Sequence, residues 1–118
     1  MKKIIILFFL TAIISCSDSN NKVVFLGDSI TENATSIKGD TLTFANGAIF
    51  VPKYTGFISR IKEKISEDIE LIGKGIGGDK VSDLLTRYRN DVIQLNPDIV
   101  FIYIGINDVW HKYDFGTG

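Results

Sequence analysis

One serine, one glycine-rich stretch and one asparagine carry the groups that an acyl-transfer reaction needs. Ser29 has a hydroxyl that becomes a nucleophile when a base takes its proton. The backbone N–H groups of Ser29 and Gly78 and the side-chain amide of Asn107 are donors for a developing oxyanion. Each of these residues has a neighbouring aspartate that we expect to support it: Asp28, Asp79 and Asp108. A serine-dependent site is therefore expected if the three stretches meet in the folded chain.

Each of the three stretches follows a run of residues that is typical of a strand. Residues 23–26 are all apolar, as in a parallel strand buried on both faces. Residues 69–72 include the charged Glu70, which suits the edge of a sheet, and residues 99–104 form the most apolar of these runs. The carboxyl ends of parallel strands meet at one edge of a sheet. We therefore expect the three polar stretches to converge there.

Two amphipathic helices are predicted between these strands. Apolar residues recur at helical spacing over residues 57–65 and again over residues 81–95. We expect Asp79 to be the N-cap of the second helix and Asn96-Pro97 to end it. Alternating strands and helices predict right-handed βαβ units and an α/β fold with a parallel sheet between helical layers. In a flavodoxin-like order the second strand lies outside the first, and the third lies on its other side.

The segment between the first strand and the first long helix is too long for an ordinary connection. Within it, residues 41–44 and 48–51 are strand-like and flank Ala45-Asn46-Gly47. Asn-Gly between two such runs predicts an inserted hairpin. This hairpin could wall the site or be a surface decoration.

The N-terminus has the features of an export signal. Met1-Lys2-Lys3 is basic, residues 4–14 are an apolar run too short to span a bilayer, and Cys16 follows the small residue Ser15. This arrangement resembles a bacterial lipobox, so residues 1–16 are predicted to be a lipoprotein signal peptide and residues 17–22 a tether. The protein is then exported and anchored to a membrane by a lipid on Cys16, on the periplasmic or cell-surface side. The alternative is a plain signal peptide with an incidental cysteine.

Composition gives no electrostatic support for a nucleic-acid partner, so we expect none. The chain has 118 residues with 13 basic and 14 acidic side chains. Cleavage after residue 16 removes two lysines and leaves 11 basic against 14 acidic side chains, a net charge of −3. No basic cluster is present in the sequence, so a nucleic-acid backbone has no electrostatic partner.

Together the three stretches resemble the first three sequence blocks of the SGNH hydrolases, also called GDSL esterases or lipases. The blocks are residues 27–30 (Gly-Asp-Ser-Ile), 75–79 (Gly-Ile-Gly-Gly-Asp) and 105–108 (Gly-Ile-Asn-Asp). The resemblance implies a flavodoxin-like three-layer α/β/α fold, Ser29 as the nucleophile, and Ser29, Gly78 and Asn107 as the oxyanion hole. It implies hydrolysis of small-molecule or polysaccharide acyl esters, either carbohydrate O-acetyl groups or lipid or thioester acyl groups, with no metal or other cofactor.

The last block of that family, Asp-x-x-His, has no accepted counterpart in the sequence. Asp108 and His111 have this spacing but directly follow Asn107, so we do not assign them as the catalytic pair. Trp110 and His111 are instead expected to line the pocket. The apolar third strand would also be an unprotected sheet edge. We therefore expect residues 23–118 to be the N-terminal part of a hydrolase domain, inactive alone, with the catalytic His and Asp beyond Gly118.

Two alternatives from other classes stay open at this point. One is a non-catalytic binding lipoprotein on the same fold, which the presence of Ser29, Gly78 and Asn107 disfavours. The other is a dinucleotide-binding domain, because Gly73-x-Gly75-x-x-Gly78 fits that fingerprint. The fingerprint belongs on a central strand, however, and Asp79 puts a negative charge where a pyrophosphate would lie. Gly73 also departs from the hydrolase pattern, which often has Asn there.

Overall fold

Strand β1 (Asn21–Gly27) lies at the centre of the sheet. The computed structural model describes residues 21–43 and 47–116, except for the side chains of residues 114 and 115. β1 pairs in parallel with β4 (Ile69–Gly75) on one side and with β5 (Ile99–Tyr103) on the other. The sheet order β4-β1-β5 is the predicted flavodoxin-like order, with the charged second strand at an edge.

The apolar run of β1 explains its central place. All four residues from Val23 to Leu26 are buried, as expected for a strand covered on both faces. β1 nevertheless begins at Asn21, and the Lys22 N–H donates to the Asp98 carboxylate at 2.8 Å. The predicted tether over residues 17–22 is therefore two residues too long. The predicted signal peptide and Cys16 lie outside the described residues.

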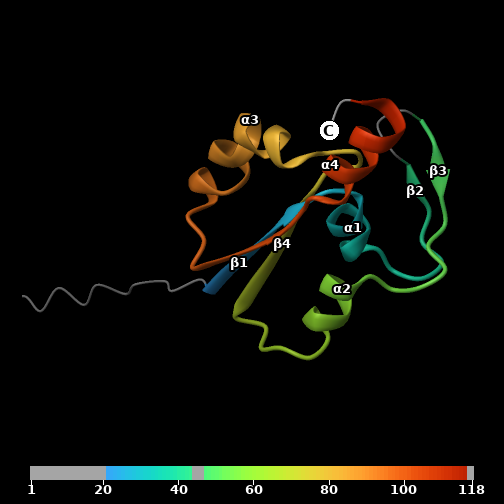
Figure 1. Ribbon diagram of the computed structural model, residues 1–118. Coiled ribbons are helices and arrows are strands. Elements are labelled where there is room, and N and C mark those ends of the chain that lie inside the picture. The colour runs from blue at the N-terminus through green and yellow to red at the C-terminus, as the bar shows by residue number, and fades with distance from the viewer. Residues whose placement is uncertain (1–20, 44–46, 117–118) are drawn as a thin grey trace, which may run out of the picture.

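Helical elements lie on both sides of the sheet (Figure 1). One side carries α1 (Ser29–Glu32), the 3₁₀ turn Asn33–Thr35 and α2 (Phe57–Lys62). Val23 and Phe25 pack there against Ala34 and Ile58. The other side carries α3 (Val81–Asp91), whose buried residue is Leu84. The predicted three-layer arrangement is confirmed for the described residues.

The helix ends differ from those predicted. α2 ends at Lys62 rather than near Ile65. α3 ends at Asp91, and a separate 3₁₀ turn, Ile93–Leu95, follows before Asn96 adopts a left-handed conformation with φ 47°. Most of the apolar stripe of α3 is not covered, and Leu85 is 72% exposed. Apolar spacing located both helices, but it did not predict where they end.

The inserted hairpin is confirmed. β2 (Leu42–Thr43) pairs antiparallel with β3 (Ile49–Phe50) as a separate two-stranded sheet. Gly47 in the connection has φ +80°, a conformation that glycine adopts without strain.

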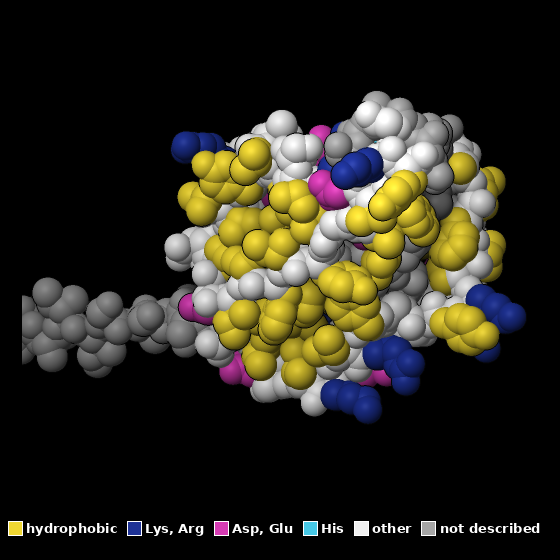
Figure 2. All heavy atoms as spheres, in the orientation of Figure 1, with side chains coloured by type: hydrophobic (Ala, Val, Ile, Leu, Met, Phe, Trp, Pro, Cys, Tyr) yellow, Lys and Arg dark blue, Asp and Glu magenta, His cyan; other side chains and the backbone are white. Residues whose placement is uncertain are grey.

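Strand β5 has no partner on its outer side within the described part of the chain. Ile99, Phe101, Ile102 and Tyr103 are exposed. Figure 2 shows apolar side chains spread across this face of the molecule. The chain then continues into α4 (Ile106–Trp110) and a π-helical turn, His111–Phe115. None of the helices in the described residues is both long enough and apolar enough to cross a bilayer.

Candidate active site

Ser29 is the first residue of α1, and a single residue, Asp28, separates it from the end of β1. Asp28 is buried before it, and its carboxylate accepts from the Ile30 N–H at 2.9 Å. Asp28 is thus the N-cap of α1 and fixes the turn in which the serine lies. The Asn33 side-chain amide donates to the Ser29 carbonyl at 2.7 Å and closes the same turn. Ser29, which is half-buried, therefore lies where a buried strand reaches the surface.

The glycine-rich stretch lies beside this turn. The Ile76 N–H donates to the Gly27 carbonyl at 3.1 Å. A Cβ placed on Gly77 would lie 3.7 Å from the Ser29 Cβ, so the two loops are in contact distance. Gly78 has φ +86° and open space where a side chain would be, so a ligand can approach its backbone closely. Gly73 and Gly75 belong to the end of β4 itself.

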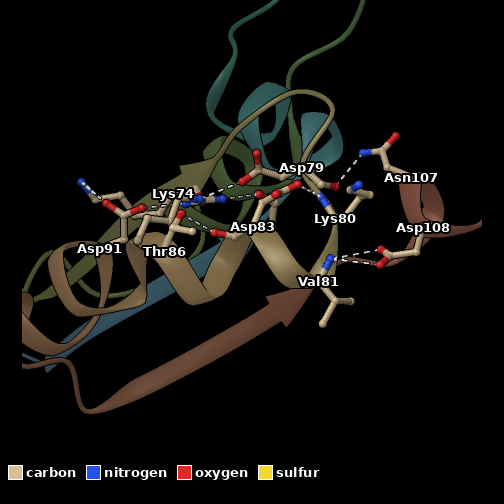
Figure 3. Close-up of polar contacts among 11 residues, drawn as sticks. Lys74, Asp79, Lys80, Val81, Asp83, Thr86, Asp91, Asn107 and Asp108 are labelled. Carbon is tan, nitrogen blue, oxygen red and sulfur yellow. Dashed lines mark hydrogen bonds and ion pairs between the residues drawn. The ribbon is translucent and has the colours of Figure 1, made fainter. Parts of the chain in front are cut away.

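The third stretch reaches the same place through Asn107. Asn107 lies in α4 and is only 6% exposed. Its side-chain Nδ2 donates to the Asp79 carbonyl at 2.9 Å (Figure 3). The sequence-predicted convergence of the three loops is confirmed to this extent: Gly77 lies beside Ser29, and Asn107 is bonded to the residue after Gly78. Their catalytic roles stay predictions.

The predicted N-cap of α3 is wrong. Asp79 lies one residue before the N-cap position, which Lys80 occupies. Both carboxylate oxygens of Asp108 accept from the Val81 N–H, at 3.1 and 3.2 Å, so α4 supplies the cap from a distant part of the sequence (Figure 3). The Asp79 carboxylate instead accepts from Arg87 Nε at 2.8 Å. The Asp79 carboxylate is therefore paired with a guanidinium on α3 and does not cap the helix.

Arg87 contacts the candidate site, although the sequence alone did not identify it as a site residue. Its Nη2 donates to the Gly27 carbonyl at 2.8 Å, and its Nη1 donates to the Lys74 carbonyl at 3.0 Å and to Asp91 at 2.6 Å. The side chain is only 13% exposed. No local pattern separates Arg87 from the exposed Arg89 two residues later, because both belong to one charged helical segment.

A pocket of about 360 Å³ adjoins the start of α1. It is lined by Asp28, Ile30, Tyr103, Ile104, Gly105, Ile106 and Val109. Trp110 and His111 are not among these residues, and Trp110 is exposed at the end of α4. Trp110 and His111, which we expected to line the site, therefore do not line this pocket.

The dinucleotide-binding alternative loses its structural support. Its first two glycines, Gly73 and Gly75, lie inside a strand at the edge of the sheet rather than in a loop after a central strand. A Cβ on Gly75 would lie 2.0 Å from the Glu32 nitrogen, and a Cβ on Gly73 would lie 2.6 Å from Thr35 Cγ2. These glycines therefore allow α1 and the following 3₁₀ turn to pack closely on β4.

The chain is similar to known ester hydrolases. Residues 25–117 match the GDSL-like lipase/acylhydrolase family. The chain is 39% identical over 97 residues to an acetylxylan esterase of Geobacillus stearothermophilus. The aligned region covers 81% of this chain and 43% of that protein. It is 28% identical over 110 residues to the uncharacterized lipoprotein YqeF of Bacillus subtilis, covering 92% of this chain and 41% of that protein.

Solved structures show the same relationship. The crystal structure of the acetyl xylan esterase AlAXEase has a TM-score of 0.63 and 39% identity, with 82% of this chain and 43% of that chain covered. The acetylxylan esterase structure from Geobacillus stearothermophilus has a TM-score of 0.59 and 33% identity, with 82% and 44% covered. The chain thus spans less than half the length of these relatives.

Proposed function

The chain belongs to the GDSL-like lipase/acylhydrolase family, and from this membership we propose that the protein is a serine esterase with Ser29 as its nucleophile. The observation that carries the proposal is the meeting of three loops. Gly77 lies beside Ser29, and Asn107 is bonded to the carbonyl of Asp79. A hydroxyl and two kinds of amide donor are thereby gathered at one edge of a parallel sheet, where α/β proteins build their sites.

The proposed reaction has two steps. In the first, a base takes the proton of the Ser29 hydroxyl while the oxygen bonds to the acyl carbon. The carbonyl electrons move onto its oxygen, and the tetrahedral intermediate collapses as the alcohol leaves with the proton. In the second, water adds to the acyl-enzyme with the same base accepting its proton. Ser29 leaves, is reprotonated, and the carboxylic acid is released.

The oxyanion of each step needs donors placed in advance. We assign this role to the backbone N–H groups of Ser29 and Gly78 and to the side chain of Asn107. The open space beside Gly78 and the burial of Asn107 support the assignment. We place the base, a histidine with its orienting aspartate, in the part of the domain that follows residue 118 in the longer relatives.

For the substrate we propose O-acetyl groups on a carbohydrate. The support is that the relatives with the highest identities reported above are acetylxylan esterases, at 39% identity. Acyl groups on lipids or thioesters are the competing substrate class.

The test is ester hydrolysis by the complete gene product. Acetylated xylooligosaccharides and a short-chain lipid ester are compared as substrates, with Ser29→Ala as the variant and Ser82→Ala, an exposed serine on α3, as its control. We expect Ser29→Ala to remove turnover and Ser82→Ala to retain it. Full turnover by Ser29→Ala would refute the nucleophile, and a preference for the lipid ester would refute the substrate.

We also propose that a lipid on Cys16 anchors the protein outside the cytoplasm. The sequence around Cys16 and the relation to a Bacillus subtilis lipoprotein support this location. Cys16→Ser is expected to abolish labelling with a radioactive fatty acid and to release the protein from membranes. Retention of the variant in the membrane fraction would contradict the anchor.

A further inference from the structure

Arg87 contacts two of the three loops directly. Its Nη2 bonds to the carbonyl of Gly27, two residues before Ser29. Its Nε bonds to the Asp79 carboxylate in the glycine-rich loop, and its Nη1 bonds to the Lys74 carbonyl near the end of β4. One side chain on α3 therefore holds the ends of both β1 and β4.

The third loop is reached through Asp79. The carboxylate of Asp79 accepts from Arg87, and its backbone carbonyl accepts from Asn107 Nδ2. Fixing Asp79 thus also fixes the partner that orients the Asn107 amide. The bonds run without a break from the nucleophile turn through one guanidinium to the proposed side-chain oxyanion donor.

The chemistry of the guanidinium suits this task. It is planar and always charged, and its five N–H donors point in fixed directions. Arg87 uses all three of its nitrogens, in a site where Asp79 and Asp91 have 15% and 19% of their side chains exposed. An ammonium group offers three donors from a single point and cannot reach the same spread of acceptors.

We propose that Arg87 is a positioning residue that holds the nucleophile turn, the glycine-rich loop and Asn107 in one arrangement. It does not touch the reacting atoms. Because this proposal rests on the proposed esterase function, its test includes a measurement that does not require activity.

That measurement is amide hydrogen exchange and NMR on the complete gene product. Arg87→Lys is the main variant because it keeps the positive charge between the two aspartates, and Arg89→Lys on the same helix is the matched control. We expect Arg87→Lys to lower the protection of the Ile76 amide, which bonds to Gly27, at least about tenfold. The Asn107 side-chain amide signal should shift or broaden, while amides in the middle of β1 keep their protection.

A second variant separates the two loops. Asp79→Asn keeps the carbonyl that accepts from Asn107 but removes the charged partner of Arg87. It should disturb the Asn107 signal and leave the bond between Arg87 and Gly27 in place. The Ile76 amide should therefore lose less protection than in Arg87→Lys.

Activity is the second readout. We expect Arg87→Lys to lower kcat by about ten- to a hundredfold, with a smaller change in KM, since misplaced groups lose transition-state contacts. Unchanged loop protection would overturn the positioning role even if kcat fell. An equal loss of protection throughout β1 would also overturn it, in favour of a general stabilising role. If the unmodified protein hydrolyses no ester, the proposed function fails, and the exchange data still decide the role of Arg87.

Discussion

Asn107 can bind two partners with one amide group. A side-chain amide has two N–H donors, and the bond from Nδ2 to the Asp79 carbonyl uses one of them. The second donor is then available for an oxyanion in the proposed reaction. In the proposed reaction, the first bond orients the side chain and the second donor binds the oxyanion.

Asn107→Ala is predicted to lower kcat by roughly 10²–10³, the loss seen when one preorganised oxyanion donor is removed. KM should change little, because the donor acts mainly on charge that develops in the transition state. Steady-state kinetics on an acetyl ester provide the measurement, with Asn90→Ala on the exposed face of α3 as the control. Nearly full kcat in Asn107→Ala would remove Asn107 from the oxyanion hole.

Residue types and short spacings were enough to place the candidate site, but not its supporting contacts. Each of the three proposed site residues follows a strand that its apolar sequence predicts. The approach of Ser29, Gly78 and Asn107 to one sheet edge could therefore be predicted. Arg87 lies 60 positions from its acceptor Gly27, and no local pattern encodes such a contact. Asp79 was assigned as a helix cap on local chemistry alone, and its pairing with Arg87 overrode that preference.

At the scale of elements, α3 connects the parts of the site. Its Arg87 contacts the ends of β1 and β4, and its first turn is bonded to α4 through Asp108. The N–H groups of the first turn of a helix have no partners within the helix and favour a negative charge. A carboxylate from α4 satisfies this need and fixes the position of the helix that carries Asn107.

Asp108→Ala is predicted to lower the free energy of unfolding by about 0.5–2 kcal/mol, the usual cost of losing an N-cap. Asp108→Asn should cost less, because its side-chain oxygen can still accept from Val81. Urea unfolding of the complete gene product measures both, and Asp68→Ala in the exposed turn before β4 is the control. Equal stability of Asp108→Ala and the control would show that the capping bond contributes nothing.

Strands were easier to predict than helix ends. The apolar runs that became β1 and β5 are distinct, and the charged Glu70 correctly indicated an edge for β4. The end of α3 was placed at Asn96 on the strength of Pro97, but the helix stops at Asp91. Val92 and Leu95 continue the apolar spacing beyond that point, but the backbone there forms the 3₁₀ turn Ile93–Leu95 and not a further turn of α3.

At the scale of the whole molecule, apolar side chains gather on the face shown in Figure 2, and β5 contributes Ile99, Phe101, Ile102 and Tyr103 as exposed residues. An open strand edge offers N–H and C=O groups to any other strand, and natural edges are usually charged or covered. β5 is neither within the described residues, and Ile102 is 63% exposed. The chain also matches less than half of its relatives' length.

Residues 17–118 expressed on their own are predicted to self-associate through β5. Apolar side chains and unpaired backbone groups on the same strand favour strand-to-strand pairing between copies. Light scattering at increasing protein concentration measures the association. Ile102→Lys should reduce it, whereas Ile49→Lys on the hairpin, which changes another exposed isoleucine, should not. Association that both variants reduce to the same degree would argue against β5 as the contact.

The same chain of residues 17–118 is predicted to have negligible esterase activity. Ser29 needs a base within hydrogen-bond reach of its hydroxyl, and His111 is the only imidazole in the sequence. His111 follows α4, and the carboxylate that would orient it, Asp108, caps α3 through Val81. Hydrolysis of a short-chain acyl ester by residues 17–118, by its His111→Ala variant and by the complete gene product decides the matter. Robust turnover by residues 17–118 that disappears with His111→Ala would identify His111 as the base, and no further histidine would then be needed.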